Sequence, residues 1–133
     1  MQTFQQTAAI KLIGTLVNTF PIGIKEAFDQ LYQTFGSNRA YYGLSWMDDK
    51  GGIIYYAMAP ALSPEEETLT GYEKFTMPPG TYRTESIKDW MSKTDSIKDI
   101  FMRLTAGIKP DKNHPCIEWY QSDDDMICMV KVD

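Results

Sequence analysis

Apolar side chains recur at helical spacing in two segments of the chain that match each other position by position. Ile, Phe and Leu stand at positions i, i+4 and i+7 of both residues 24–31 and residues 97–104, and Phe35 and Ile108 continue the two stripes. This spacing gathers the apolar side chains on one face of a helix. The sequence therefore predicts an internal repeat with two amphipathic helices, each packing one face on a sheet.

Residues that begin or end helices flank the two stripes. Gly36 and Gly107 stand near the two C-terminal ends, where glycine commonly terminates a helix. Residues 94–96 carry hydroxyl and carboxylate side chains directly before the second stripe, so we expect them to cap its first turn.

Each predicted helix is followed by the pattern of a β-hairpin, in which runs of β-branched and aromatic residues are split by an Asp-rich or Gly-rich cluster. The three parts of each hairpin are residues 42–47, 48–52 and 53–59 in the first copy and residues 116–121, 122–125 and 126–132 in the second.

An extended segment precedes each helix, at residues 9–19 and 72–87, the second interrupted by Pro-Pro-Gly at 78–80. This order of elements predicts an α+β fold of two pseudo-symmetric βαββ repeats, about 7–60 and 71–133, within a single domain spanning 1–133. One repeat cannot bury both faces of its sheet, so we expect one antiparallel sheet with both helices on one face. Residues 60–70, with two prolines and three consecutive glutamates, are expected to form an exposed connector.

Charge and apolar content narrow the classes of partner. The net charge is −5, and the basic residues are scattered rather than clustered, which argues against direct binding of nucleic acid or anionic membranes. The first twenty residues lack a signal-peptide pattern, and no apolar run is long enough to span a bilayer, so we expect a cytoplasmic protein. Cys116 and Cys128 are expected to be small buried hydrophobes rather than a disulfide.

Aromatic residues and methionine are unusually abundant: six Phe, eight Tyr, three Trp and eight Met. Such side chains suit an adaptable apolar cavity, although for most individual positions an ordinary place in the core is the simpler interpretation. Their arrangement has to decide between these interpretations.

Three features together resemble the GyrI-like superfamily over nearly the whole chain: the paired βαββ units, the Pro78 to Tyr82 stretch that opens the second copy, and the strand Ile117-Glu118-Trp119-Tyr120. Relatives include effector-binding domains of multidrug-responsive transcription regulators, stand-alone gyrase inhibitors and hydrolases of cyclopropane-bearing compounds. The resemblance implies capture of a small organic ligand, with Glu118 matching the strand glutamate of that family.

Glu118 and Tyr120 alternate with Ile117 and Trp119 along the strand, so the carboxylate and the phenol share one face. If this face is recessed, partial loss of water raises the pKa of Glu118. The alternative is a solvent-facing Glu118 paired across the hairpin with Lys131. A strand register wrong by one residue would exchange Glu118 with its neighbours.

The leading hypothesis is binding of apolar, cationic or amphipathic organic compounds, with Glu118 as the counter-ion and aromatic and Met side chains as walls. A hydrolase of strained or reactive xenobiotics is the second hypothesis, with Glu118 as general acid/base and Tyr120 or another phenol of the pocket polarising the substrate. The third hypothesis is a gyrase-inhibitor-like interaction with a protein partner, and only the negative net charge of the chain favours it. The sequence predicts no oligomeric state.

Further aromatic residues are candidates for the same pocket. Tyr82 follows the Pro-Pro-Gly segment toward the second helix, and Trp90, in the loop before that helix, could either form a lid or seal the helix onto the sheet. Gly43 occupies the hairpin position that Glu118 holds in the second copy, which would let a ligand approach the backbone closely. The wall candidates in the first copy are Tyr42, Trp46 and Tyr56.

Several kinds of site have little support. His114 is the only histidine and stands in a polar turn, so neither a Ser/His/Asp triad nor a multi-histidine metal site is expected. Residues 123–125 lack the spacing of a calcium loop, and no glycine pattern typical of nucleotide binding is present. We therefore expect neither a metal nor a cofactor.

Overall fold

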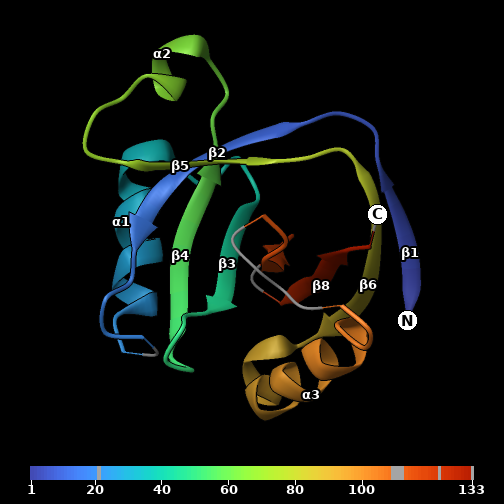
Figure 1. Cartoon of the computed structure of the whole chain (residues 1–133). Helices are drawn as coiled ribbons and strands as arrows, with labels where there is room; N and C mark the ends of the chain where they lie inside the picture. The colour runs from blue at the N-terminus through green and yellow to red at the C-terminus, as the bar shows by residue number, and fades with distance from the viewer. Residues whose placement is uncertain (21, 109–112, 123, 133) are drawn as a thin grey trace.

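A computed structural model of the chain describes residues 1–20, 22–108, 113–122 and 124–132. It contains an eight-stranded antiparallel sheet with α1 beside β4 and α3 below β8, as Figure 1 shows. The elements in chain order are β1 (Gln2–Gln6), β2 (Ile10–Leu16), α1 (Ile24–Phe35), β3 (Tyr41–Met47), β4 (Ile53–Pro60), α2 (Pro64–Glu67), β5 (Glu73–Met77), β6 (Gly80–Lys88), the 3₁₀ helix η1 (Trp90–Lys93), α3 (Thr94–Leu104), β7 (Cys116–Tyr120) and β8 (Asp125–Lys131).

The strand order, β1-β6-β8-β7-β3-β4-β2-β5, reads as two related halves joined through β7 and β3. Each half also contributes an edge strand to the other, because β1 pairs with β6 and β5 pairs with β2. This confirms the α+β class, the antiparallel sheet and the two-fold repeat. The two halves are therefore interlocked rather than merely packed side by side.

The sequence pattern predicts six strands, and the described residues form eight. β1 was not predicted, because its sequence QTFQQ is polar and has no alternation of apolar residues. The second extended segment is two strands, since Pro78 and Pro79 separate β5 from β6. Residues 60–70 are an exposed or half-buried connector, but the expectation that they contain no helix or strand was wrong. Pro64 begins the short helix α2, and the Ser63 hydroxyl accepts a hydrogen bond from the Glu66 amide at its N-cap.

Both main helices follow the predicted stripes. α1 ends at Gly36, whose φ of 88° lies in the left-handed region that glycine adopts readily. The predicted capping of α3 was wrong, because Thr94 is already its first residue and Lys93 stands at the N-cap without a side-chain hydrogen bond. The Ser96 hydroxyl instead donates to the Lys93 carbonyl.

The two faces of the sheet bury different cores. On the helix-covered face, α1 packs over β3 and β4, and α3 packs over β6 and β8, so that β7 lies between the two helices. The opposite face is the inside of the curled sheet and holds its own cluster. The buried members of that inner cluster are Leu12, Tyr42, Leu44, Met58, Met77, Tyr82, Ile117 and Met129.

Arg39 joins α2 to the sheet. Its guanidinium donates to both carboxylate oxygens of Glu66, at 2.7 and 3.2 Å, and to the Pro60 carbonyl at 2.9 Å. The same group lies 5.3 Å from the centre of the Phe35 ring, a cation–π distance. The Arg39 side chain is only 11% exposed, so this ion pair is stronger than a typical surface pair. Within the described ranges, no helix has the length and apolarity needed to cross a membrane.

Candidate functional site

Glu118 lies near the middle of the sheet, on the face that carries both helices. On β7 it pairs with Gly43 of β3 on one side and with Cys128 of β8 on the other. Its Oε1 accepts two hydrogen bonds, one from the Tyr120 hydroxyl at 2.6 Å and one from the Tyr55 hydroxyl at 2.8 Å. Glu118 is therefore half-buried, and the alternative pairing with Lys131 is wrong, because Glu118 stands opposite Cys128 and the alternation along β8 directs Lys131 to the other face of the sheet.

Burial dominates the electrostatics of this group. Loss of water raises the pKa of Glu118, and the hydrogen bonds from Tyr120 and Tyr55 counteract only part of the rise. Burial also raises the pKa of both phenols, and the neighbouring carboxylate raises it further. The phenols therefore stay protonated at neutral pH and serve as hydrogen-bond donors.

Three aromatic rings, here called the aromatic roof, pack against the two phenols: Phe20, Phe28 and Trp90. Phe20 stacks on Tyr55 with ring centres 5.1 Å apart. Phe28 of α1 and Trp90 of η1 both meet Tyr120 edge to face, at 5.3 and 5.1 Å. The roof thus comes from three separate segments, and it covers the two phenols that bond to the carboxylate with apolar surface.

Trp90 has two unusual features within the roof. Its indole Nε1 is buried and, among the described residues, has no hydrogen-bond acceptor. Asp89, directly before it, has φ and ψ of 54° and 49°, the left-handed conformation that non-glycine residues rarely adopt. The predicted loop before the second helix is a 3₁₀ helix that leads into α3.

The structure brings Glu118, Tyr120 and Trp90 together and places the other predicted wall residues elsewhere. Tyr42 pairs with Trp119, and the two rings stack at 6.1 Å on the inner face of the sheet. Trp46 stacks on Tyr56 on that same face, at 5.5 Å.

Tyr82 is also part of the inner cluster, where its hydroxyl donates to the Pro78 carbonyl. The register between β3 and β7 determines which residues share a face with Glu118. Gly43, not Tyr42, stands opposite Glu118, so Tyr42 and every second residue from it point to the inner face. The prediction that Tyr82 borders the cleft of Glu118 was likewise wrong by strand parity, because Glu85 is the β6 residue in line with Cys128 and Glu118.

Sequence reasoning missed three residues at the site: Tyr55, Phe20 and Phe28. Phe28 is part of the helical stripe and was assigned to the core, where it also packs. Tyr55 is one of four consecutive residues that all favour a strand, so the sequence does not show which face of the sheet it occupies. The register between β4 and β3 determines that face. Phe20 lies beyond the end of β2 and carries no pattern that distinguishes it.

No protein-family model matches the chain, and neither does any curated protein sequence. Solved structures do resemble it. One is an integron cassette protein from the mobile metagenome of Vibrio cholerae, with a TM-score of 0.69 and 17% identity over 99% of this chain and 95% of that one. Another is SAV2435 bound to tetraphenylphosphonium, with a TM-score of 0.69 and 15% identity over 100% of this chain and 94% of that one. The likeness establishes the fold.

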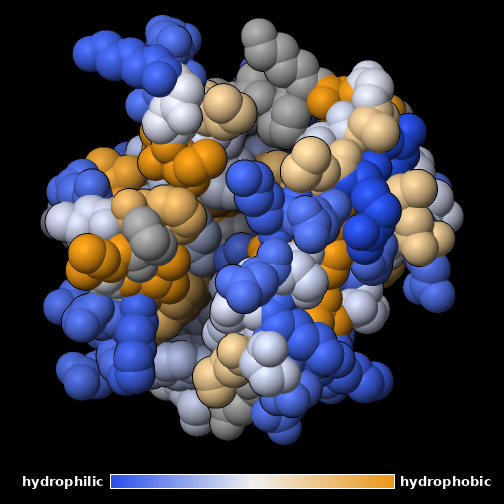
Figure 2. All heavy atoms as spheres, turned by 90° about the horizontal axis from the view of Figure 1, so that it is seen from below, coloured by the Kyte–Doolittle hydropathy of each residue, from blue (hydrophilic) through white to orange (hydrophobic). Residues whose placement is uncertain are grey.

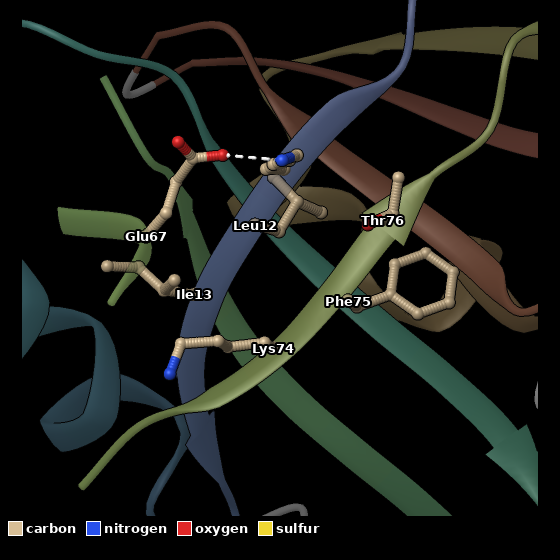
Figure 3. Close-up of a pocket in the computed structure, with 7 residues that line it drawn as sticks. Leu12, Ile13, Glu67, Lys74, Phe75 and Thr76 are labelled. Atoms are coloured by element: carbon tan, nitrogen blue, oxygen red, sulfur yellow. Dashed lines mark ion pairs between the residues drawn. The ribbon is translucent and has the colours of Figure 1, made fainter. Parts of the chain in front are cut away.

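Two surface hollows lie at another part of the sheet, near α2. One of about 240 Å³ is lined from β2, β5 and Glu67, and Figure 3 shows the Lys11–Glu67 ion pair, 3.0 Å long, at its side. A second, of about 450 Å³, is lined by the start of β2 and the segment before α2. Neither contains Glu118. Lys11 is 65% exposed, so its ion pair contributes little stability.

The surface seen from below in Figure 2 is divided between hydrophobic and hydrophilic regions. Figure 2 shows apolar side chains gathered on one side of this surface, hydrophilic side chains over the centre and the other side, and a hollow between them.

Within the described ranges, no group of three or more His, Cys, Asp or Glu residues is placed to hold a metal ion. Both cysteines are free thiols.

Proposed function

We propose that this protein binds lipophilic organic cations, with Glu118 as the counter-ion and the aromatic roof as the wall of the site. The observation that carries the proposal is a half-buried carboxylate whose Oε1 accepts two phenol hydrogen bonds, while aromatic rings from three segments pack on those two phenols. Within the described part of the chain, no hydrogen bond reaches Oε2 of Glu118. That oxygen is therefore available to a positive ligand.

The chemistry selects apolar cations over small hydrated ones. A cation near aromatic faces gains about 0.5 to 2 kcal/mol per ring, and attraction to the carboxylate is strong where water is excluded. A small inorganic cation would lose its hydration shell without replacement, whereas a large cation with a delocalised or shielded charge loses little. The structure of SAV2435 bound to tetraphenylphosphonium supports this choice of ligand class.

Binding requires movement of the roof. Phe28 and Trp90 both pack directly on Tyr120, so a ligand that reaches the carboxylate takes over part of this ring-to-ring contact. We propose that η1 moves aside together with Trp90, since the strained backbone of Asp89 precedes it. The Trp90 indole N–H would then find an acceptor in water or in the ligand.

The test is thermal denaturation with tetraphenylphosphonium and with neutral triphenylphosphine oxide. We expect the cation to stabilise the wild type, by about 2.7 kcal/mol at a hundred times the dissociation constant, and the neutral compound to have little effect. Glu118→Gln should lose most of the stabilisation. Glu73→Gln, which removes an exposed charge on β5, is the matched control and should behave as wild type. Failure of the cation to stabilise the wild type would refute the proposal.

A second candidate is hydrolysis of a strained electrophile, favoured by one observation: a carboxylate with a raised pKa beside two protonated phenols. In that role Glu118 would take a proton from the attacking water while a phenol donates a hydrogen bond to the oxygen that gains charge. Mass spectrometry of ligands that stabilise the protein separates the two functions. An altered ligand mass that depends on Glu118 indicates an enzyme, and an unaltered mass indicates a binding protein.

A further inference from the structure

Gly43 has no room for a side chain. A Cβ atom built on this residue would lie 2.1 Å from the Tyr55 Oη, 2.8 Å from the Tyr55 Cζ and 2.7 Å from Oε1 of Glu118. Real Cβ atoms do not approach other heavy atoms so closely. The space over Gly43 is therefore occupied by the protein itself, and the expectation that a ligand approaches the backbone there is wrong.

The strand order explains why this space is needed. Tyr55 is on β4 and Glu118 is on β7, and β3 runs between them. Neighbouring strands are about 4.8 Å apart, so the Tyr55 side chain has to cross a whole strand to reach the carboxylate. It crosses at Gly43, which pairs directly with Glu118.

We infer that Gly43 is a positioning residue of the cation site: the missing Cβ is the passage through which the Tyr55 phenol reaches Glu118. The effect of Gly43 on cation binding rests on the proposed function, because the hydrogen bond from Tyr55 favours the charged form of the carboxylate that would bind the cation. It assigns to the first half of the repeat a role in a site whose carboxylate comes from the second half.

The groups that face Glu118 define what the loss of this bond would do. The titratable ones are Tyr55, Tyr120, Cys116 and Cys128, while α1 and η1 contribute uncharged rings. Glu85 of β6 lies on the same face one strand beyond Cys128, where it forms an ion pair with Arg103 of α3. The Tyr55 bond lowers the pKa of Glu118 against the larger effect of burial. Without it the carboxylate keeps one donor, its pKa rises further, and less of it is charged at neutral pH.

The experiment is a double-mutant cycle of Gly43→Ala and Tyr55→Phe, read by ¹³C NMR titration of the Glu118 carboxyl, whose signal is assigned by its loss in Glu118→Gln. Each single variant should raise the pKa of Glu118 and weaken tetraphenylphosphonium binding about tenfold at pH 7. The double variant should match Tyr55→Phe alone in both readouts, because there is only one hydrogen bond to lose. It should also melt at a higher temperature than Gly43→Ala, because the atom nearest the new methyl group is gone.

Ile13→Val is the control for a purely structural effect, because Ile13 is buried on β2 away from the carboxylate. It should lower the melting temperature and leave the titration of Glu118 unchanged. The inference is overturned if Gly43→Ala titrates and binds like wild type, if the two pKa changes add in the double variant, or if neither Gly43→Ala nor the double variant folds. If the wild type fails to bind the cation, the proposed function fails, and the titration still decides the role of Gly43.

Discussion

Replacing Glu118 with glutamine should make the unliganded protein more stable at neutral and alkaline pH. The ionised carboxylate loses several kcal/mol of hydration on burial, and each phenol bond to it returns about 1.5 to 3 kcal/mol. The pKa of Glu118 nevertheless remains raised, so burial outweighs the two bonds. Glutamine can accept both phenol bonds through its carbonyl oxygen without carrying a charge. Because the lost hydration exceeds what the two bonds return, we expect Glu118→Gln to raise the free energy of unfolding by about 1 to 3 kcal/mol.

The gain should depend on pH in a defined direction. Below the ordinary pKa of about 4.3, Glu118 is protonated in both states and the substitution changes little. As the pH rises, the unfolded chain releases this proton first, so the wild type loses stability until the pH passes the raised native pKa. Above that point the difference between the two proteins is constant.

Denaturant unfolding from pH 4 to 9 measures this difference directly, and the other titrating groups cancel between the two proteins. In a chain of this size a gain of 1 to 3 kcal/mol corresponds to a rise of roughly 4 to 10 °C in melting temperature. Glu73→Gln, on the exposed part of β5, should show no such difference. A Glu118→Gln protein that is no more stable than wild type at pH 8, with a difference independent of pH, would refute the reasoning.

Two further predictions concern other parts of the fold. Arg39→Met keeps the aliphatic stem but removes the bonds to Glu66 and Pro60, so it should cost about 1 to 3 kcal/mol in urea unfolding. The hydrogen bond from Arg39 lowers the pKa of Glu66, so the stability that this ion pair contributes should be lost from the wild type as the pH falls below the ordinary pKa of Glu. The variant has no such ion pair to lose, and equal acid sensitivity of the two proteins would contradict this reasoning. Burial raises the pKa of Cys116 to about 12 and also raises that of Cys128. Iodoacetamide at pH 8 should therefore label neither thiol in the native state and both thiols in denaturant. Rapid labelling of the native protein would contradict this and show that reagent reaches the helix-covered face of the sheet.

The local elements could be predicted from the sequence because their signals are local. The stripes of residues 24–35 and 97–108 predict helices within a few residues of α1 and α3, and the Asp-rich turns predict both hairpins. β1 could not be predicted this way, because nothing in QTFQQ alternates. It becomes a strand only by pairing with β6, which is distant in the sequence.

The composition of the site depended on register, which is a non-local property. Tyr42 and Trp46 were correctly placed on one face of a strand, but on the face away from Glu118. One available signal pointed the right way. Gly43 was identified as the counterpart of Glu118, and combined with the alternation along β3 that equivalence already directs Tyr42 to the opposite face. Tyr55 had no comparable signal, because reaching Glu118 across an intervening strand depends on the absence of a side chain at another position.

The same geometry explains why a repeated fold has one acidic site rather than two. Gly43 and Glu118 face each other across neighbouring strands at the junction of the two halves. A glutamate at both positions would place two carboxylates side by side in a desolvated layer, where they could not both be ionised near neutral pH. A glycine in one half removes that repulsion and opens the passage that the Tyr55 phenol uses. The asymmetry thus gives a single carboxylate two hydrogen-bond donors on one oxygen, and it leaves the other oxygen without a hydrogen bond among the described residues, where the proposed ligand would bind.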